Sequence, residues 1–482
     1  MESLPQMSAA LTHVLTTVAD EAAPAVGFVR RRRVLTGASF VQALVLGFLA
    51  RPEATLHQLT QTLAARGAAI SPQGMAQRLG PAAAAQQERV LAAAVTAPVR
   101  AEPAAIPLLE RFAGGVWVLD CTTVRLPDAL AAVWRGCGGR TGHGTQAALK
   151  LQVRLDLAGG RMEGPVVLDG RTQDKAGPLH DALLPPDALV VTDLGFWSLE
   201  RLRAIGEAGA FWLSRLDPHT HAFAAGERLD LPRWLARPRT STVEADVRLG
   251  ARARLPARLL AAKAPKAVAD ARRRKLRAAA KREGTAPPKA TLALAGWTVY
   301  VTNVPADRLT LAEAFVLGRA RWQIELLFKL WKSGGRLDES RSADPWRILC
   351  EVYAKLVALV IQHWLLLVGC WDRPDRSLTR AAQTIRAHAV CLLRALDQPG
   401  RLVEELAAIG LSRQNLVING VLPESEVVHD ALAAAIRQRE QAAIASMPAA
   451  LRDLGDGWWQ FAERAGSDPF GFDFRTEPAD EA

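Results

Sequence analysis

The chain has 482 residues, which is more than one ordinary hydrophobic core encloses, so we expect about two or three domains. Hydrophobic residues make up 49% of the chain and exclude an intrinsically disordered protein. The net charge of +11 favours a polyanionic partner such as nucleic acid. The scattered Cys residues form no Cys-x-x-Cys pair, which indicates a reducing cytosol and argues against a disulfide framework and a zinc site.

No membrane or export segment is predicted. Met1–Ala23 carries acidic residues and lacks the continuous apolar core of a signal peptide. Two apolar runs, Phe40–Ala50 and Leu356–Trp371, are shorter than the roughly 20 residues of a bilayer span, and the second contains Gln362 and His363. We interpret both as buried helices and expect a soluble, cytoplasmic protein.

Residues 1–105 are rich in Ala and predict an all-helical domain. Within them, Thr55–Arg66 has an amphipathic period, and Ser71 with Pro72 forms an N-cap and first-turn pair that opens a second short helix. The two helices resemble a helix-turn-helix, but ordinary bundle packing explains them equally well. The basic run Arg30–Arg33 either contacts phosphates or is a solvated helix start.

From Gly114 the pattern becomes that of a mixed α/β domain. The runs Ala147–Leu157 and Met162–Leu168 form a hairpin, and a helix capped by Ser198 joins the runs Ala188–Thr192 and Phe211–Arg215. We therefore expect three antiparallel strands followed by a strand, a helix and a strand. The β-type runs are Val116–Leu119, Val124–Leu126, Ala147–Leu157, Met162–Leu168, Ala188–Thr192 and Phe211–Arg215.

Two carboxylates, Asp120 and Asp193, each directly follow a β-type run. Strand ends are where open α/β folds place their sites, although a single Asp there is more often a turn or cap residue. Together with a helical Glu, two such residues can hold two Mg²⁺ ions whose shells are completed by phosphate oxygens.

A helix is predicted for Leu317–Lys332, which reads LGRARWQIELLFKLWK. At about 100° per residue, Arg321, Glu325 and Lys332 fall within roughly 60° of one another, and Lys329 lies close to the same line. One carboxylate among three cations suits a metal ligand beside a phosphate-binding strip, or else a solvated face with an Arg–Glu pair. The opposite flank, which should face a core, carries Ile324, Leu327 and Leu330.

Residues 217–303 form a long segment between the second Asp and the Glu. Its stretch Lys263–Lys289 holds ten Lys and Arg residues and two acidic residues. The stretch is either a solvated basic helix or a segment that contacts the DNA backbone, and the overall charge favours DNA contact. The segment ends in a strand-like run that contains Trp297, by itself a core or edge aromatic residue. The most basic part of the stretch is Arg272, Arg273, Arg274 and Lys275.

The helix carries a family resemblance. Arg321, Glu325 and Lys332 match, in type and spacing, the last three letters of the Tyr-Arg-Glu-Lys signature. That signature is typical of bacterial insertion-sequence transposases of the DDE type, in the branch named after insertion sequence four. Gly318 stands where the signature has Tyr. Asp120-x-Thr122 resembles the first catalytic Asp motif of the family, and Asp193-x-Gly195-Phe196 resembles the second.

This resemblance implies an α/β fold with an RNase H-like mixed sheet core and a β-rich insertion, preceded by an all-helical N-terminal domain and followed by C-terminal helices. The expected domains are a helical DNA-binding domain (1–105), the first part of the core (106–216), the basic, partly β insertion (217–303), the second part of the core (304–375) and a C-terminal helical region with a tail (376–482).

The resemblance also implies a mechanism. Asp120, Asp193 and Glu325 would bind two Mg²⁺ ions, with Mn²⁺ able to substitute, for in-line displacement at phosphorus. Arg321 and Lys332 would hold phosphates of the element's end, and Trp297 would stack on a flipped base. A homodimer would cut double-stranded DNA at terminal inverted repeats through a hairpin and join the ends to target DNA. Gly318 would remove one phosphate contact.

Two other interpretations remain open. The first is a catalytically silent DNA-binding protein, such as a regulator or a decayed transposase, which would need the basic residues and not the carboxylates. The second is a Mg²⁺-dependent nuclease of the same fold, which would cut without joining.

Overall fold

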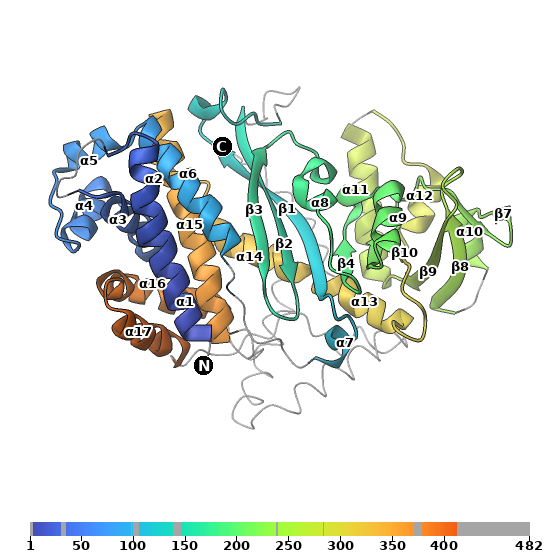
Figure 1. The fold of residues 1–482 in the computed structure, drawn as a ribbon. Coiled ribbons are helices and arrows are strands. Elements are labelled where there is room, and N and C mark those ends of the chain that lie inside the picture. Colours follow the sequence, from blue (N-terminus) through green and yellow to red (C-terminus); the bar gives the residue numbers. More distant parts are fainter. Residues whose placement is uncertain are drawn as a thin grey trace. The chain divides into compact units, whose positions relative to one another are not determined.

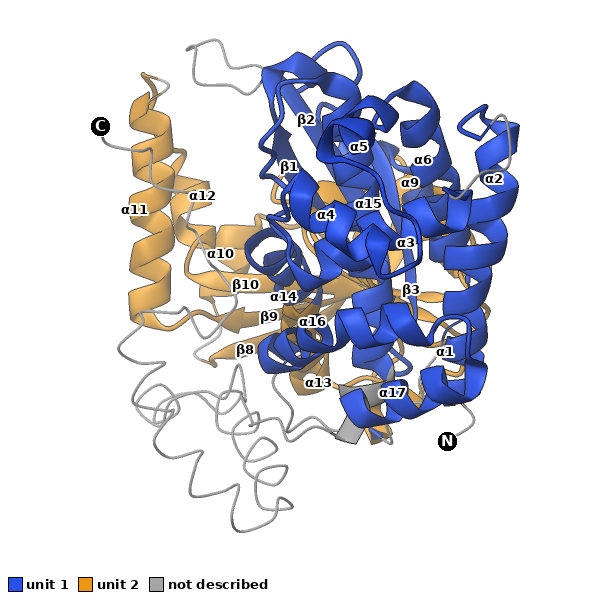
Figure 2. Cartoon of the chain, turned by 90° about the vertical axis from the view of Figure 1, so that its left-hand side faces the viewer, with its two compact units in different colours: residues 1–106, 119–180, 324–415 blue, residues 107–118, 181–323, 416–482 orange. Residues whose placement is uncertain are grey.

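The computed structural model describes residues 3–29, 35–97, 99, 106–137, 146–237, 240–282, 284–370 and 378–411, whose helices and strands are drawn in Figure 1. The chain divides into two compact units, each of which combines segments far apart in the sequence (Figure 2). Unit 1 comprises residues 1–106, 119–180 and 324–415, and unit 2 comprises residues 107–118, 181–323 and 416–482. The domain ranges expected from the sequence remain predictions.

The described N-terminal residues of unit 1 form helices joined by short turns and contain no strand, as predicted for residues 1–105. Thr55 and Gln58 form a reciprocal capping box at the start of one helix, and Ser71 caps the next by accepting from the Gly74 amide. Both predicted helix starts are therefore confirmed. The elements are α1 (Ser3–Thr12), the π-helix η1 (His13–Val18), α2 (Ala19–Ala25), α3 (Gly37–Ala50), α4 (Leu56–Ala64), α5 (Pro72–Arg78) and α6 (Pro81–Thr96).

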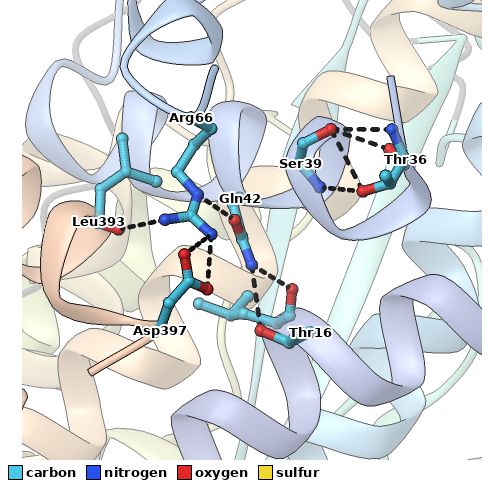
Figure 3. Close-up of polar contacts among 8 residues, drawn as sticks. Thr16, Thr36, Ser39, Gln42, Arg66, Leu393 and Asp397 are labelled. Carbon is cyan, nitrogen blue, oxygen red and sulfur yellow. Dashed lines mark hydrogen bonds and ion pairs between the residues drawn. The ribbon is translucent and has the colours of Figure 1, made fainter. Parts of the chain in front are cut away.

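A polar network holds the turn after α4 within unit 1 (Figure 3). The guanidinium of Arg66 donates to Gln42 of α3 at 2.8 Å and to the Leu393 carbonyl, and it forms an ion pair with Asp397 at 2.6 Å. Arg66 is thus engaged within the protein. The DNA-binding role of α4 and α5 stays a prediction, and the basic run Arg30–Arg33 lies outside the described residues.

Three helices of unit 1 lie late in the chain: α15 (Pro345–Cys370), α16 (Leu378–Ala395) and α17 (Pro399–Leu411). Helix α15 packs against α3 and α6. It is long and apolar enough to span a membrane, but 94% of its most apolar window is buried inside the chain, as is typical of a core helix. The prediction of buried helices is confirmed for Phe40–Leu49 and, in the second run, for 356–367, whereas Trp371 lies outside the described residues. The tail predicted beyond α17 lies outside the described residues.

The strands form a mixed sheet, which confirms the predicted fold class. Their order is β3-β2-β1-β4-β5-β10-β9-β8-β6-β7. β4 is parallel to both β1 and β5, whereas β10 is antiparallel to β5 and β9. The strands are β1 (Val116–Leu126), β2 (Ala147–Asp156), β3 (Met162–Asp169), β4 (Leu189–Thr192), β5 (Phe211–Arg215), β6 (Ala222–Ala224), β7 (Glu227–Arg228), β8 (Thr242–Leu249), β9 (Leu255–Lys263) and β10 (Trp297–Thr302).

One strand prediction needs correction. The runs Val116–Leu119 and Val124–Leu126 are one continuous strand, β1, because the residues between them include neither Gly nor Pro and contain two β-branched Thr. Asp120 therefore lies within a strand and not at its end. In unit 2 the strands of the insertion continue the same sheet, because β10 pairs with β5 on one side and with β9 on the other.

The predicted helix Leu317–Lys332 is divided into three parts. Helix α13 (Leu311–Ala320) ends at Arg321, α14 (Trp322–Lys329) follows, and the π-helix η5 (Leu330–Gly334) closes the segment. This helical segment ends at Gly335, where an added Cβ would lie 2.6 Å from the Trp331 carbonyl oxygen. The remaining described helices of eight or more residues are α9 (Leu199–Glu207) and α11 (Lys266–Arg282).

Candidate active site

In unit 2, Asp193 follows β4 directly, as predicted, and is half-buried. Its Oδ1 accepts a hydrogen bond from the Leu194 amide at 2.7 Å, so the side chain caps the short 3₁₀-helix η4 (Leu194–Phe196). Its Oδ2 lies 3.9 Å from Nη2 of Arg321, whose side chain is only 16% exposed. Two of the residues singled out from the sequence, far apart in the chain, are thus brought together.

In unit 1, Asp120 shows the same local arrangement. It is half-buried, and its Oδ1 accepts from the amide of the next residue, Cys121, at 2.8 Å. The parallel register of β1 and β4 pairs Val118 with Val191. Asp120 follows Val118 by two residues within β1, and Asp193 follows Val191 by two residues, directly after β4 ends.

Glu325 lies in the first turn of α14, also in unit 1, and is half-buried. The predicted core-facing flank is confirmed, since Ile324, Leu327 and Leu330 are all buried. The segment is not one unbroken α-helix, because Arg321 is the C-cap of α13, Glu325 belongs to α14 and Lys332 belongs to the π-helix η5 with a different residue spacing. The shared face of these three residues stays a prediction. Lys329 is exposed and Lys332 is half-buried.

The donor atoms of the predicted triad fit a hard divalent cation, because all three side chains are carboxylates. Both aspartates are oriented by a backbone amide through one carboxylate oxygen. The three residues divide between the units: Asp120 and Glu325 lie in unit 1, and Asp193 lies in unit 2. Among the described residues, no group of three or more His, Cys, Asp or Glu side chains is gathered as a metal site.

A second polar group near Asp120 has no recognisable pattern in the sequence. Lys150 of β2 forms an ion pair with Asp174 at 2.6 Å. Burial, followed by the charges of Asp174 and Asp120, raises the pKa of the Cys121 thiol far above its usual range. Cys121 therefore remains a neutral thiol at physiological pH and is unsuited to be a nucleophile.

The basic residues 272–275 lie on α11, where some are buried and others are exposed. Arg272 is 7% exposed, and its guanidinium donates at 3.1 Å to the Trp297 carbonyl and to the Thr298 hydroxyl of β10. Arg273 donates to Asp270 of its own helix. Its Nε also donates to the Leu292 carbonyl at 3.2 Å, so both arginines fasten α11 to neighbouring segments. Arg274 and Lys275 lie on the exposed face.

Trp297 is the first residue of β10 and is half-buried. It pairs with Lys263 of β9, whose Nζ lies 5.5 Å from the centroid of its ring. A half-buried ring with a cation nearby leaves part of the aromatic surface accessible.

A mixed sheet, an aspartate beside a half-buried arginine and exposed cations on a basic helix are typical of an α/β protein that processes nucleic acid. The chain belongs to the family described as the transposase DDE domain, whose model matches residues 112–361. The resemblance inferred from the motifs is therefore confirmed.

The chain is also similar to individual transposases. It is 26% identical to the transposase for insertion sequence element IS231C of Bacillus thuringiensis subsp. berliner, over 82% of this chain and 87% of that protein. It is 24% identical to the IS231B transposase of the same organism, over 72% and 77% of the two chains. The transposase for IS1151 of Clostridium perfringens is 22% identical, over 54% of this chain and 59% of that protein.

Proposed function

We propose that this protein is the transposase of an insertion sequence, which cuts the ends of its element and joins them to target DNA. The observation that carries the proposal is the approach of Arg321 to Asp193 within unit 2. This contact brings Asp193 of the second Asp motif close to Arg321, the arginine of the Tyr-Arg-Glu-Lys signature. A carboxylate beside a partly buried guanidinium suits a scissile phosphate, because the arginine can bind phosphate oxygens in a bidentate manner.

In this proposal Asp120, Asp193 and Glu325 hold the divalent metal, which is Mg²⁺ with Mn²⁺ able to substitute. A bound divalent ion would supply Lewis-acid activation of a water or 3′-hydroxyl and stabilise the leaving oxygen. The aspartates contribute preorganisation, since the amides of Cys121 and Leu194 each fix one of their oxygens.

The chain's cations position the DNA. Arg321 binds the phosphate nearest Asp193, and Lys329 and Lys332 hold phosphates farther along the transposon end. Arg274 and Lys275, exposed on α11, meet the backbone of the duplex through charge alone and carry no sequence information. The partners are double-stranded DNA with terminal inverted repeats and target DNA, bound by a homodimer.

The proposal is tested by cleavage of a labelled duplex that carries the element's own terminal repeat. The wild-type protein should cut at the repeat boundary in Mg²⁺, and Asp193→Ala should not. Asp246→Ala, which removes an exposed carboxylate of β8, is the matched control and should cut normally. Specific binding without cleavage by the wild type would instead identify a silent DNA-binding protein, and cutting without joining would identify a nuclease.

Trp297→Ala should impair hairpin formation about tenfold or more while leaving the first nick nearly unchanged. The reason is that a flipped base loses its stacking partner, a contact worth about 1–3 kcal/mol. Gel separation of nicked and hairpin products measures both steps. Trp346→Ala, which removes an exposed Trp of α15, controls for loss of an indole. An equal loss of nicking and hairpin formation would contradict a base-stacking role for Trp297.

A further inference from the structure

Tyr300 of β10 points at the backbone of α13 inside unit 2. Its ring packs edge-on against Phe315, with ring centroids 5.1 Å apart, and the residue is 8% exposed. At Gly318, one helical turn further, an added Cβ would lie 2.5 Å from both Cζ and the hydroxyl oxygen of Tyr300. The tip of the phenol ring thus occupies the space that any side chain at position 318 would need.

This contact explains why a glycine stands at position 318, in the last turn of α13. Gly in a helix interior costs roughly 1 kcal/mol relative to Ala, because it loses more conformational freedom on folding. At position 318 the φ angle is not in the left-handed region, so the backbone itself does not require Gly. The requirement comes from Tyr300, whose hydroxyl reaches the helix surface only when position 318 has no side chain.

Charged residues share this part of unit 2 with Tyr300. Tyr300 is the direct antiparallel partner of Arg215 on β5, so the two side chains lie on the same face of the sheet. Burial raises the pKa of Tyr300, the positive charges of Arg215 and Arg321 oppose that rise, and the charge of Asp193 adds to it. The phenol is therefore a neutral hydrogen-bond donor at physiological pH, within the electrostatic reach of two arginines and of the candidate metal ligand.

We propose that Tyr300, Arg215 and Arg321 form a phosphodiester-binding subsite beside Asp193, in which the Tyr300 hydroxyl donates to a phosphate oxygen and the two guanidinium groups balance the phosphate charge. This inference rests on the proposed function and deepens it, since it names residues that hold the DNA strand next to the reacting phosphate. A hydrogen bond from a neutral hydroxyl to a charged acceptor is stronger than one between neutral groups.

The test is Tyr300→Phe, which removes the hydroxyl and keeps the ring that packs against Phe315 and Gly318. The chain has a single other tyrosine, Tyr353, whose hydroxyl contacts Glu88 at 3.4 Å in unit 1, so Tyr353→Phe is a matched control. The probe is a duplex of the element's terminal repeat, with a neutral methylphosphonate replacing one phosphate at a time. Binding is measured in EDTA, so that the result does not depend on a loaded metal site.

We expect Tyr300→Phe to bind the unmodified duplex about tenfold more weakly than the wild type and Tyr353→Phe to bind it equally well. We also expect one methylphosphonate position that weakens binding by the wild type and no longer weakens binding by Tyr300→Phe. A tyrosine that only fills the core would change the melting temperature but not this position-specific profile.

The outcomes separate this inference from the proposed function. If the wild type cleaves the repeat and Asp193→Ala does not, while Tyr300→Phe binds every modified duplex as the wild type does, the subsite is overturned and the transposase stands. If the wild type does not distinguish the repeat duplex from unrelated DNA and does not cut it, both are overturned.

Discussion

Glu325→Gln is expected to abolish strand cleavage, by about 1,000-fold or more, which corresponds to roughly 4 kcal/mol in the activation barrier. Gln has nearly the same size as Glu but lacks the negative charge and the second acceptor oxygen that a divalent cation requires. The half-buried side chain follows the fully buried Ile324, and an isosteric change keeps the packing of α14. Affinity for the terminal repeat should be unchanged or slightly higher, because one charge that repels phosphate is removed.

The measurement is cleavage and binding of the same labelled duplex by wild type and variant. Glu339→Gln is the matched control, since Glu339 is an exposed carboxylate of unit 1 whose partner is Arg336 at 3.2 Å. It should cleave normally, because exposed ion pairs contribute little. Cleavage retained by Glu325→Gln would remove Glu325 from the proposed triad, and a parallel loss of binding would indicate damage to the fold.

Gly318→Tyr is expected to destabilise the protein by about 1–3 kcal/mol and to lower cleavage with it. Comparison with the signature alone suggests the opposite, since Tyr at this position would restore the family's missing side chain. The structure predicts a collision, because a Cβ at 318 would meet the Tyr300 ring tip at 2.5 Å. Combining Gly318→Tyr with Tyr300→Ala should recover most of the lost stability, since the second change empties the space that the first one fills.

Urea unfolding of the single and double variants measures this coupling through a double-mutant cycle, in which contacting residues deviate from additivity by about 0.5–3 kcal/mol. Gly400→Tyr is the matched control. Gly400 is a helical glycine of α17 with no atom within 4 Å of an added Cβ, so its replacement should be neutral or slightly stabilising. Strictly additive effects at positions 300 and 318 would contradict the steric account.

Burial changes the interpretation of the basic stretch. Sequence reasoning treated Arg272 to Lys275 as one charged group, because charge is visible in the sequence and burial is not. The structure turns Arg272 inward to the backbone of β10 and leaves Arg274 and Lys275 outside. DNA affinity carried by charge should therefore depend on the latter pair, whereas loss of Arg272 should act on stability.

The sequence by itself determined the features whose causes are local. Ser71 and Ser198 mark helix starts because their side chains accept from amides three residues ahead. β4 and β5 are short apolar runs bounded by breaks, and Asp193, Glu325 and Arg321 were singled out by spacing within motifs. The family match over residues 112–361 rests on the same kind of information.

Only the tertiary structure decided the features that depend on partners distant in the chain. β10 joins β5 because the pairing of strands distant in the chain is set by tertiary packing. The pairing of Tyr300 with Gly318 needed the tertiary structure for the same reason: a glycine in a helix and a tyrosine in a strand acquire meaning only when packing brings them within van der Waals distance.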